Sequence, residues 1–343
     1  FFFKQKTAYE IYQCDWSSDV CSSDLDSFGV NNEQFSLTSV GESREAGYRV
    51  ELVQVTDRYH HRSFRLERKL FLVFTSRLQR YLVKRPHLAF EHRRNIARPL
   101  VYLPPGVRAW TAYMPGGLAT QPVHNPETKT LASGKRVDPL TRRLFRHSID
   151  AIGLRSRAYI MTWRIGRLLE KTKEPVTWLS LASGSGQPVY DAVSVLGPEK
   201  FRSIIITDSD TETLAFAAKL AKQEGVIAAA NLYLEQLEVF DSVAFEKLFR
   251  VHKPTIVDAM GLFEYLQADQ AAELLDRVYA ELPCGGTFIF TNMSPDHPHL
   301  DLHKRGLGWP GVITRTVEDM VSILSRTKLP KSTVEIFRAD DKV

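Results

Sequence analysis

Residues 178–192 read WLSLASGSGQPVYDA, and this stretch decides the fold. An apolar strand that ends at Leu181 runs into a turn of small residues, and a helix follows directly. Small residues let a ligand lie against bare backbone, and the start of a helix offers N–H groups to an anionic group. Turns of this kind are common, so a ligand site is indicated only if other site residues follow at the expected positions in the sequence.

An acidic residue stands at the end of the next expected strand. The run IIITDSDTETL places Asp208 22 residues after Gly186. In nucleotide-binding α/β folds, an acid about 20 residues beyond the turn holds the two hydroxyls of a ribose. The alternative is an ordinary turn with a helix cap at Asp208 or Asp210.

The surrounding sequence alternates between strand and helix patterns. Apolar runs predict strands, and runs with helical spacing lie between them. This alternation predicts a doubly wound, mostly parallel α/β sheet over residues 138–343. The expected strands are 176–181, 202–207, 231–237, 254–259 and 285–293, and the expected helices between them are 187–196, 210–224, 243–251 and 268–282.

Residues 26–137 form a separate, basic N-terminal extension with its own α/β pattern. Residues 26–45 are polar and predict a tail, 47–55 predict a strand, and 68–83 predict a helix. Residues 87–123 are interrupted by Pro104-Pro105 and by Pro115-Gly116-Gly117, which predicts loops and short pieces.

Positive charge is concentrated near the start of the chain. Residues 26–150 hold 21 Lys and Arg against 11 Asp and Glu, a net charge of +10, whereas the whole chain carries +5. One interpretation is a polyanionic partner such as RNA or acidic lipid, and the other is a solvated arginine-rich face. The stretch lacks the glycine and aromatic pattern of a known nucleic-acid module.

Residues 1–25 resemble the translation of a sequencing-library adapter, in the runs Lys4–Ile11 and Cys14–Leu25. We therefore exclude them from the expected fold and predict that they are disordered. Cys284 is then the one cysteine left, which gives no disulfide framework and favours a reducing, cytoplasmic compartment. No stretch approaches the ~20 apolar residues of a membrane span.

The turn lacks the third glycine of a dinucleotide fingerprint, since Val189 stands in its place, and no P-loop is present. The order of its motifs instead resembles class I S-adenosylmethionine-dependent methyltransferases. LSLASGSG stands where that family has LDxGxGxG, IIITDSD where it has its second acid, and IVDAMGLFEYL where it has its fourth-strand motif. GLFEYL and residues 286–320 are similar to a group of bacterial methyltransferase-like proteins. The resemblance covers about residues 140–343.

The resemblance implies S-adenosylmethionine as cofactor and a set of site residues. Asp208 would take the ribose hydroxyls, Gln236 would face the adenine, and Asp258, Met260 and Gly261 would lie beside the methyl group. The backbone that approaches the cofactor would be Ala182, Ser183, Gly184, Ser185 and Gly186.

Two positions depart from the family pattern. Ser180 replaces its acid, and Ala182 replaces its first glycine. Ala182 adds a methyl group close to the ligand, which is tolerable if its φ is negative.

Further residues carry weaker indications. Asp258 is the candidate for acceptor positioning or base chemistry, with a structural cap as its alternative. Arg155 and Arg157 could reach the cofactor carboxylate or form a basic helix face. Glu264, Tyr265, Trp309 and Arg315 are further pocket candidates. The run HPHLDLH (297–303) has no zinc-like spacing, so we expect no metal; its histidines contact the acceptor or belong to a plain loop.

The sequence thus predicts methyl transfer by in-line displacement to an unknown acceptor, most simply a small molecule. The alternatives are a nicotinamide-dependent oxidoreductase on the same fold and a non-catalytic module that binds a nucleoside or RNA. The family sheet ends with an antiparallel seventh strand between strands five and six. Residues 332–343 supply strand six and then stop, so we expect a fragment without strand seven and with an unpaired edge at strand five.

Overall fold

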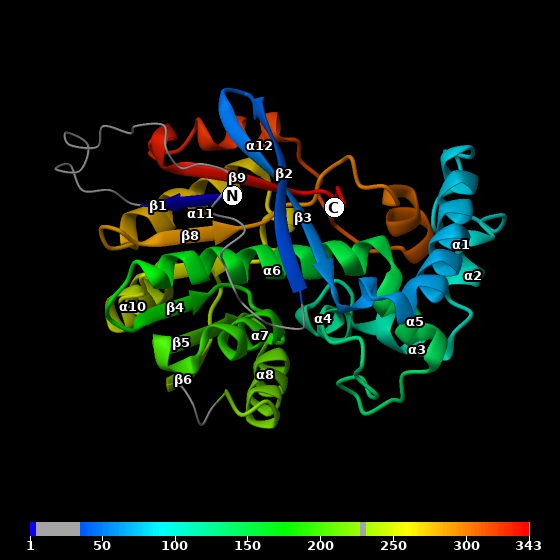
Figure 1. Cartoon of the computed structure of the whole chain (residues 1–343), viewed down its shortest axis with the longest axis horizontal. Helices are drawn as coiled ribbons and strands as arrows, with labels where there is room; N and C mark the ends of the chain where they lie inside the picture. The colour runs from blue at the N-terminus through cyan, green and yellow to red at the C-terminus, as the bar shows by residue number, and fades with distance from the viewer. Residues whose placement is uncertain (5–34, 227–230, 343) are drawn as a thin grey trace.

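A computed structural model describes residues 1–4, 35–226 and 231–342. Its centre is a nine-stranded sheet in the order β2-β3-β9-β1-β8-β7-β4-β5-β6 (Figure 1). The strands are β1 (Phe2–Lys4), β2 (Phe35–Glu45), β3 (Tyr48–Asp57), β4 (Val176–Ser180), β5 (Phe201–Asp208), β6 (Asn231–Gln236), β7 (Ile256–Ala259), β8 (Thr287–Phe290) and β9 (Val334–Ala339).

Five neighbouring strands, β8-β7-β4-β5-β6, are all parallel. Every residue of β4, β7 and β8 is buried, as expected for strands that are covered on both faces. This arrangement confirms the predicted doubly wound α/β fold. The helices around it are α6 (Ile149–Glu170), α7 (Gln187–Leu196), α8 (Thr211–Gln223), α10 (Ser242–His252), α11 (Ala268–Glu281) and α12 (Val317–Leu324).

Alternate side chains of each strand pack against different helix layers, because successive strand residues point to opposite faces. Leu179 and Ile205 belong to the core that α10, α11 and α12 cover. Trp178, Ile204 and Ile206 belong to the core on the side of α6, α7 and α8. The two cores fix the sheet between them and leave its carboxyl edge for a site.

The N-terminal region adds a hairpin to this sheet. β2 pairs antiparallel with β3, and β3 pairs parallel with β9. The strand predicted over 47–55 is confirmed, but the predicted tail is wrong for Phe35–Glu45, which form β2. Residues 26–34 lie outside the described residues. The polar composition of β2 hides it from a reading of the sequence, because most of its side chains are exposed.

Helix α1 (Arg65–Val83) confirms the helix predicted over 68–83. The pieces expected over 87–123 are also present as the short helices α2 (Ala97–Val101), α3 (Pro105–Trp110) and α4 (Gln121–His124). α5 (Pro139–His147) follows them. The chain also forms 3-10 turns η3 (Arg58–His60), η4 (Arg62–Phe64), η5 (Thr111–Tyr113), η6 (Gly117–Ala119), η7 (Pro198–Lys200), η8 (Phe263–Tyr265) and η10 (Lys331–Thr333), and a π-helix η9 (Leu302–Leu307).

β8 and β9 stand where the family sheet has strands five and six. The position between them is expected to be empty, but a strand occupies it. β1 lies antiparallel between β8 and β9 (Figure 1). The Phe1 ring stacks on Phe290, with ring centres 5.2 Å apart. The expectation of an unpaired edge is therefore wrong, and so is the prediction of disorder for residues 1–4. The sequence does not predict β1, because residues 1–25 resemble an adapter and are left out of the expected fold. Residues 5–25 lie outside the described residues.

In the described part of the chain, no helix combines the length and the apolar character needed to cross a membrane.

Candidate active site at the carboxyl ends of the parallel strands

A cavity of about 480 Å³ opens where β4, β5, β7 and β8 end. Its volume is within the range of small-molecule sites, ~300–1,000 Å³. β4 lies between β5 and β7. After β4 the strands β5 and β6 are added on one side of it, and β7 and β8 are then added on its other side. Such a switch point is where open α/β sheets bind ligands. The predicted residues on its wall are Ser180, Ala182, Ser183, Gly184, Asp208, Asp258, Met260 and Gly261.

The turn after β4 is held by backbone hydrogen bonds. Ser183 N–H donates to Thr207 O at 2.8 Å, and Gly184 N–H donates to Asp208 Oδ2 at 2.9 Å. Gly184 has φ +58° and Ala182 has φ +49°. The condition that Ala182 keeps a negative φ is therefore not met. An alanine here occupies the left-handed region that glycine adopts without cost.

Asp208 ends β5 beside this turn. Its carboxylate accepts from Gly184 N–H and from Asp210 N–H at 3.0 Å. Burial raises the pKa of Asp208 above its ordinary value, against these hydrogen bonds, which lower it. Asp208 and Asp210 have different roles, because Asp210 caps α8 by accepting from Glu212 N–H and Thr213 N–H. The helix-cap alternative is therefore confirmed for Asp210, and the ribose-binding role of Asp208 stays a prediction.

The start of α7 is poorly equipped to hold a phosphate. Gln187 N–H donates to Ser185 Oγ at 3.4 Å, Pro188 has no N–H, and Val189 N–H donates to Gly186 O at 3.0 Å. A pyrophosphate at a helix start needs such N–H groups free. This turn therefore suits a ligand that has no phosphate near α7.

Asp258 is buried at the end of β7, with 1% of its surface exposed. Trp178 Nε1 donates to its Oδ1 at 2.7 Å, and Ser180 Oγ donates to its Oδ2 at 3.1 Å. Burial raises the pKa of Asp258 to about 7, although both hydrogen bonds lower it. This contact explains the serine at position 180. Its hydroxyl can donate to Asp258, whereas an acidic residue at this position would repel the Asp258 carboxylate.

The N-terminal extension closes directly over the turn. A Cβ atom on Gly117 would lie 2.2 Å from the Cα of Gly184, and a Cβ on Gly184 would lie 2.7 Å from the Cα of Gly117. Neither position has room for a side chain. Sequence reasoning identifies Pro115-Gly116-Gly117 as a loop but does not connect it with the site, because the contact joins residues 67 positions apart.

Arg157 reaches the cavity from α6. Its Nη1 donates to Glu264 Oε1 at 2.6 Å, and its Nη2 is so close to Gly261 that a Cβ there would lie 2.9 Å away. Thr291 Oγ1 accepts from Gly261 N–H at 3.0 Å. An arginine and a carboxylate thus face the cavity beside the end of β7. Of the two predicted arginines, Arg157 is on the cavity wall.

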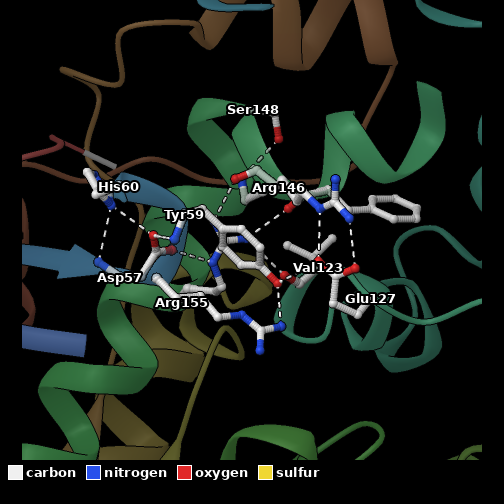
Figure 2. Close-up of polar contacts among 11 residues, drawn as sticks. Asp57, Tyr59, His60, Val123, Glu127, Arg146, Ser148 and Arg155 are labelled. Carbon is white, nitrogen blue, oxygen red and sulfur yellow. Dashed lines mark hydrogen bonds and ion pairs between the residues drawn. The ribbon is translucent and has the colours of Figure 1, made fainter. Parts of the chain in front are cut away.

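Arg155 has a different place, deep in the interface between α6 and the extension (Figure 2). Its Nε donates to Asp57 Oδ2 at 2.8 Å, its Nη1 to the carbonyls of Val123 and Phe145, and its Nη2 to the carbonyl of Arg146. It is 1% exposed and does not line the cavity. Neither alternative given for Arg155 applies, because its guanidinium is buried and bonded within the fold, away from the cavity wall and from the surface.

All three histidines of residues 297–303 are buried, and two of them contact Asp150. His303 Nδ1 lies 2.5 Å and His297 Nε2 3.3 Å from Asp150 Oδ1. Burial raises the pKa of Asp150, but the two histidines outweigh it and hold that pKa well below the usual range. His299 instead contacts Ser76 Oγ at 3.1 Å. Within residues 1–4, 35–226 and 231–342, no group of three or more His, Cys, Asp or Glu could hold a metal.

Aromatic side chains form part of the cavity wall. Trp309 stacks near His303, with ring centres 5.9 Å apart, and its Nε1 donates to Tyr265 OH at 2.7 Å. Trp110 lies next to Trp309, again with 5.9 Å between ring centres. All four of these residues line the cavity. This wall suits a flat or apolar ligand.

Three further predicted residues lie outside the cavity wall, and a fourth, Arg315, lies on it but is engaged by the fold. Ser185 and Gly186 shape the turn but do not line the cavity. Gln236 is exposed, and its Nε2 donates to Ser209 O at 3.0 Å. Arg315 touches the wall, but its guanidinium donates to Phe263 O, Leu266 O and Asn292 Oδ1, so it holds the loops together.

The comparisons with known proteins agree with the architecture. No protein-family model matches the chain, and no curated protein matches it. Among solved structures it is similar to a possible exported protein from Bordetella parapertussis, at 15% identity and a TM-score of 0.50, over 76% of this chain and 89% of that one. That likeness shows the fold alone.

Partial likenesses include several S-adenosylmethionine-dependent methyltransferases. The CurJ carbon methyltransferase is 15% identical, with a TM-score of 0.41, over 68% of this chain and 65% of that one. The magnesium protoporphyrin IX methyltransferase of Synechocystis, solved with bound SAH, is 12% identical, with a TM-score of 0.38, over 56% of this chain and 78% of that one. We infer nothing about the reaction from them.

Proposed function

We propose that this protein is an S-adenosylmethionine-dependent methyltransferase that acts on a small, flat or apolar acceptor. One observation carries the proposal. A single cavity brings together a small-residue turn, the acid Asp208 and the end of β7, while the start of α7 lacks free N–H groups for a phosphate. A nucleoside without phosphate fits this combination.

The residues on the cavity wall suit the cofactor. Asp208 would accept from ribose hydroxyls with the lone pairs that Gly184 and Asp210 leave free. The backbone of Ala182–Gly184 would lie along the amino-acid part, and Met260 and Gly261 would flank the reacting end. When bound, S-adenosylmethionine supplies a methyl group on a positively charged sulfur, which is a good leaving group.

The protein's own contribution is alignment and exclusion of water. Gly117 closes the extension over the turn, and Trp110 and Trp309 hold the acceptor side. Asp258 takes the proposed role of positioning the acceptor or accepting its proton, which a pKa of about 7 suits. Arg157 is the group proposed to bind the carboxylate of the cofactor, in competition with Glu264.

The proposal is tested by calorimetric titration of the full chain with S-adenosylmethionine, S-adenosylhomocysteine and NAD. We expect the two sulfur nucleosides to bind with a Kd of about 1–100 µM and NAD not to bind. Asp208→Ala should weaken binding at least about tenfold, which is the loss of one good hydrogen bond to a charged group. Asp210→Ala is the matched control, because it removes a helix cap two residues away and should leave Kd unchanged.

The same titration, followed by an assay for methyl transfer, separates the two alternatives. Preferential NAD binding that Asp208→Ala abolishes would place the chain among nicotinamide-dependent oxidoreductases. A sample that is folded by circular dichroism but binds none of the three ligands would contradict the proposal. Binding of the sulfur nucleosides without turnover of any acceptor would favour a non-catalytic nucleoside-binding module.

A further inference from the structure

We propose that the outer face of α1 docks the protein on an anionic lipid membrane surface. α1 lies at the margin of the molecule, on the right in Figure 1. The proposal concerns a surface outside the cavity and does not depend on methyl transfer.

An apolar stripe runs along the exposed face of α1. Four side chains at helical spacing (i, i+4, i+7, i+8) share it, and each is strongly exposed. They are Leu66 (68% exposed), Leu70 (63%), Val73 (42%) and Phe74 (44%). The opposite face holds Leu78 and Leu82 in a core of its own, so α1 is already anchored without this stripe. We call these four residues the α1 stripe.

Cations surround the stripe. Residues 58–100 contain 12 Lys and Arg against two acids, a net charge of +10. Both acids are engaged: Glu67 contacts Arg143, Arg146 and His147, and Glu91 pairs with Arg98. Arg65, Lys69 and Arg77 are exposed on α1, and in the described part of the chain no carboxylate lies within 4 Å of them.

A basic hollow adjoins the stripe. It has a volume of about 520 Å³ and opens widely to solvent. Four of the eight side chains on its wall are Arg or Lys. The wall consists of His60, Arg65, Arg68, Lys69, Leu72, Val73, Ser76 and Arg80. Such a cluster attracts a phosphate group. Because the hollow lies beside exposed leucines, its cations could contact the phosphate of a lipid headgroup while the leucines contact the acyl chains.

The combination favours lipid over RNA. A helix with an aliphatic stripe and flanking arginines lies in the plane of a membrane interface, with the stripe in the acyl boundary and the cations among anionic headgroups. Proteins that bind single-stranded RNA instead present aromatic platforms for bases, and the stripe has one ring, that of Phe74. On the inner side of the same helix, Phe71 and Thr75 line the cavity, so docking would bring one cavity wall to the lipid surface.

Vesicle flotation of the full chain tests the proposal. We expect at least about tenfold more protein bound to phosphatidylcholine vesicles that contain phosphatidylglycerol than to phosphatidylcholine alone, with binding that falls as salt rises. Leu70→Glu combined with Phe74→Glu should reduce binding about tenfold or more, because it places charge in the acyl boundary. Val243→Glu is the matched control: Val243 is 76% exposed on α10, away from α1, and its change should leave flotation unaltered.

Other outcomes overturn the proposal. One is a folded wild-type chain that does not float with anionic vesicles. A second is equal flotation of the wild type and the Leu70→Glu, Phe74→Glu variant. A third is salt-sensitive binding of an RNA oligonucleotide, unaffected by that variant, in a protein that does not float; this would assign the basic face to nucleic acid. Because all substituted residues are exposed, circular dichroism should show the variants folded.

Discussion

Two aspartates, Asp57 and Asp258, are both buried, but the cost of burying the carboxylate is offset in opposite ways. Asp57 ends β3 and is 6% exposed, and Asp258 ends β7 and is 1% exposed. Asp57 faces the guanidinium of Arg155 at 2.8 Å and the His60 ring at 2.8 Å (Figure 2). The side chain of Asp258 instead accepts from the neutral donors Trp178 and Ser180. Asp57 keeps its negative charge because the Arg155 guanidinium balances it, whereas burial favours the protonated, neutral form of Asp258.

The difference appears in the two pKa values. Burial raises the pKa of Asp57, but hydrogen bonds and charge from His60 and Arg155 outweigh it and lower that pKa to about 2. Burial dominates at Asp258 and raises its pKa to about 7. The Asp57 pair joins the extension to α6 and has a fixed charge. Asp258 lines the cavity and can change its protonation near neutral pH, which is the property a site residue needs.

The strongest way to break this comparison is to remove the cation at Asp57. Arg155→Met leaves a buried carboxylate without its partner, and we expect the free energy of unfolding to fall by about 3–5 kcal/mol. Urea denaturation followed by circular dichroism measures the loss. In the wild type the stability from Asp57 is present above its ordinary pKa of 3.8 and disappears as pH falls toward about 2.

Two controls sharpen this prediction. The double variant Arg155→Met, Asp57→Asn should recover part of the loss, because the uncompensated charge is gone. Arg326→Met removes the same residue type from a surface ion pair, in which Arg326 is 51% and Asp269 93% exposed, so it should cost less. A loss under about 1 kcal/mol in Arg155→Met would show that the pair is not a structural anchor.

The second prediction concerns the proton on Asp258. Its folded pKa of about 7 lies above the ordinary 3.8, so the folded state holds a proton that the unfolded state releases between these values. The free energy of unfolding should therefore fall as pH rises through this window, with a share from Asp258 of at most about 1.4 kcal/mol per pH unit. Asp258→Asn removes that share and should be more stable than the wild type above pH 7.

Denaturation at several pH values gives the slope for each protein. Asparagine can still accept from Trp178 and offer its amide to the Ser180 hydroxyl, so the fold is preserved. Burial also raises the pKa of Asp191 to about 7, so Asp191→Asn is a matched control that should remove its own share of the slope. Identical slopes for the wild type and Asp258→Asn would mean that Asp258 is charged throughout, like Asp57.

The two regions also differ in how far the sequence predicts them. The Asp258 region follows from local patterns, because apolar runs mark β4, β5 and β7, and the carboxyl ends of parallel strands meet at one edge. These patterns suffice to bring Asp208 and Asp258 to one cavity. The Asp57 region depends on a contact between residues 98 positions apart, and no local period reports it. For the same reason the sequence does not predict Gly117 on Gly184, or β1 between β8 and β9.

The smallest predicted effect concerns the turn two residues beyond Ser180. Ala182 has φ +49°, a conformation that costs a residue with a side chain roughly 1–2 kcal/mol. Glycine avoids this cost but loses about 0.5–1 kcal/mol more conformational entropy on folding. Ala182→Gly should therefore raise the free energy of unfolding by about 0.5–1 kcal/mol in thermal or urea denaturation. Ala46→Gly, at φ +48° in the exposed turn between β2 and β3, relieves the same strain away from the cavity and should stabilise the protein equally. If Ala182→Gly destabilises the protein while Ala46→Gly stabilises it, the Ala182 methyl group packs in the Asp258 region and the conformational cost is offset there.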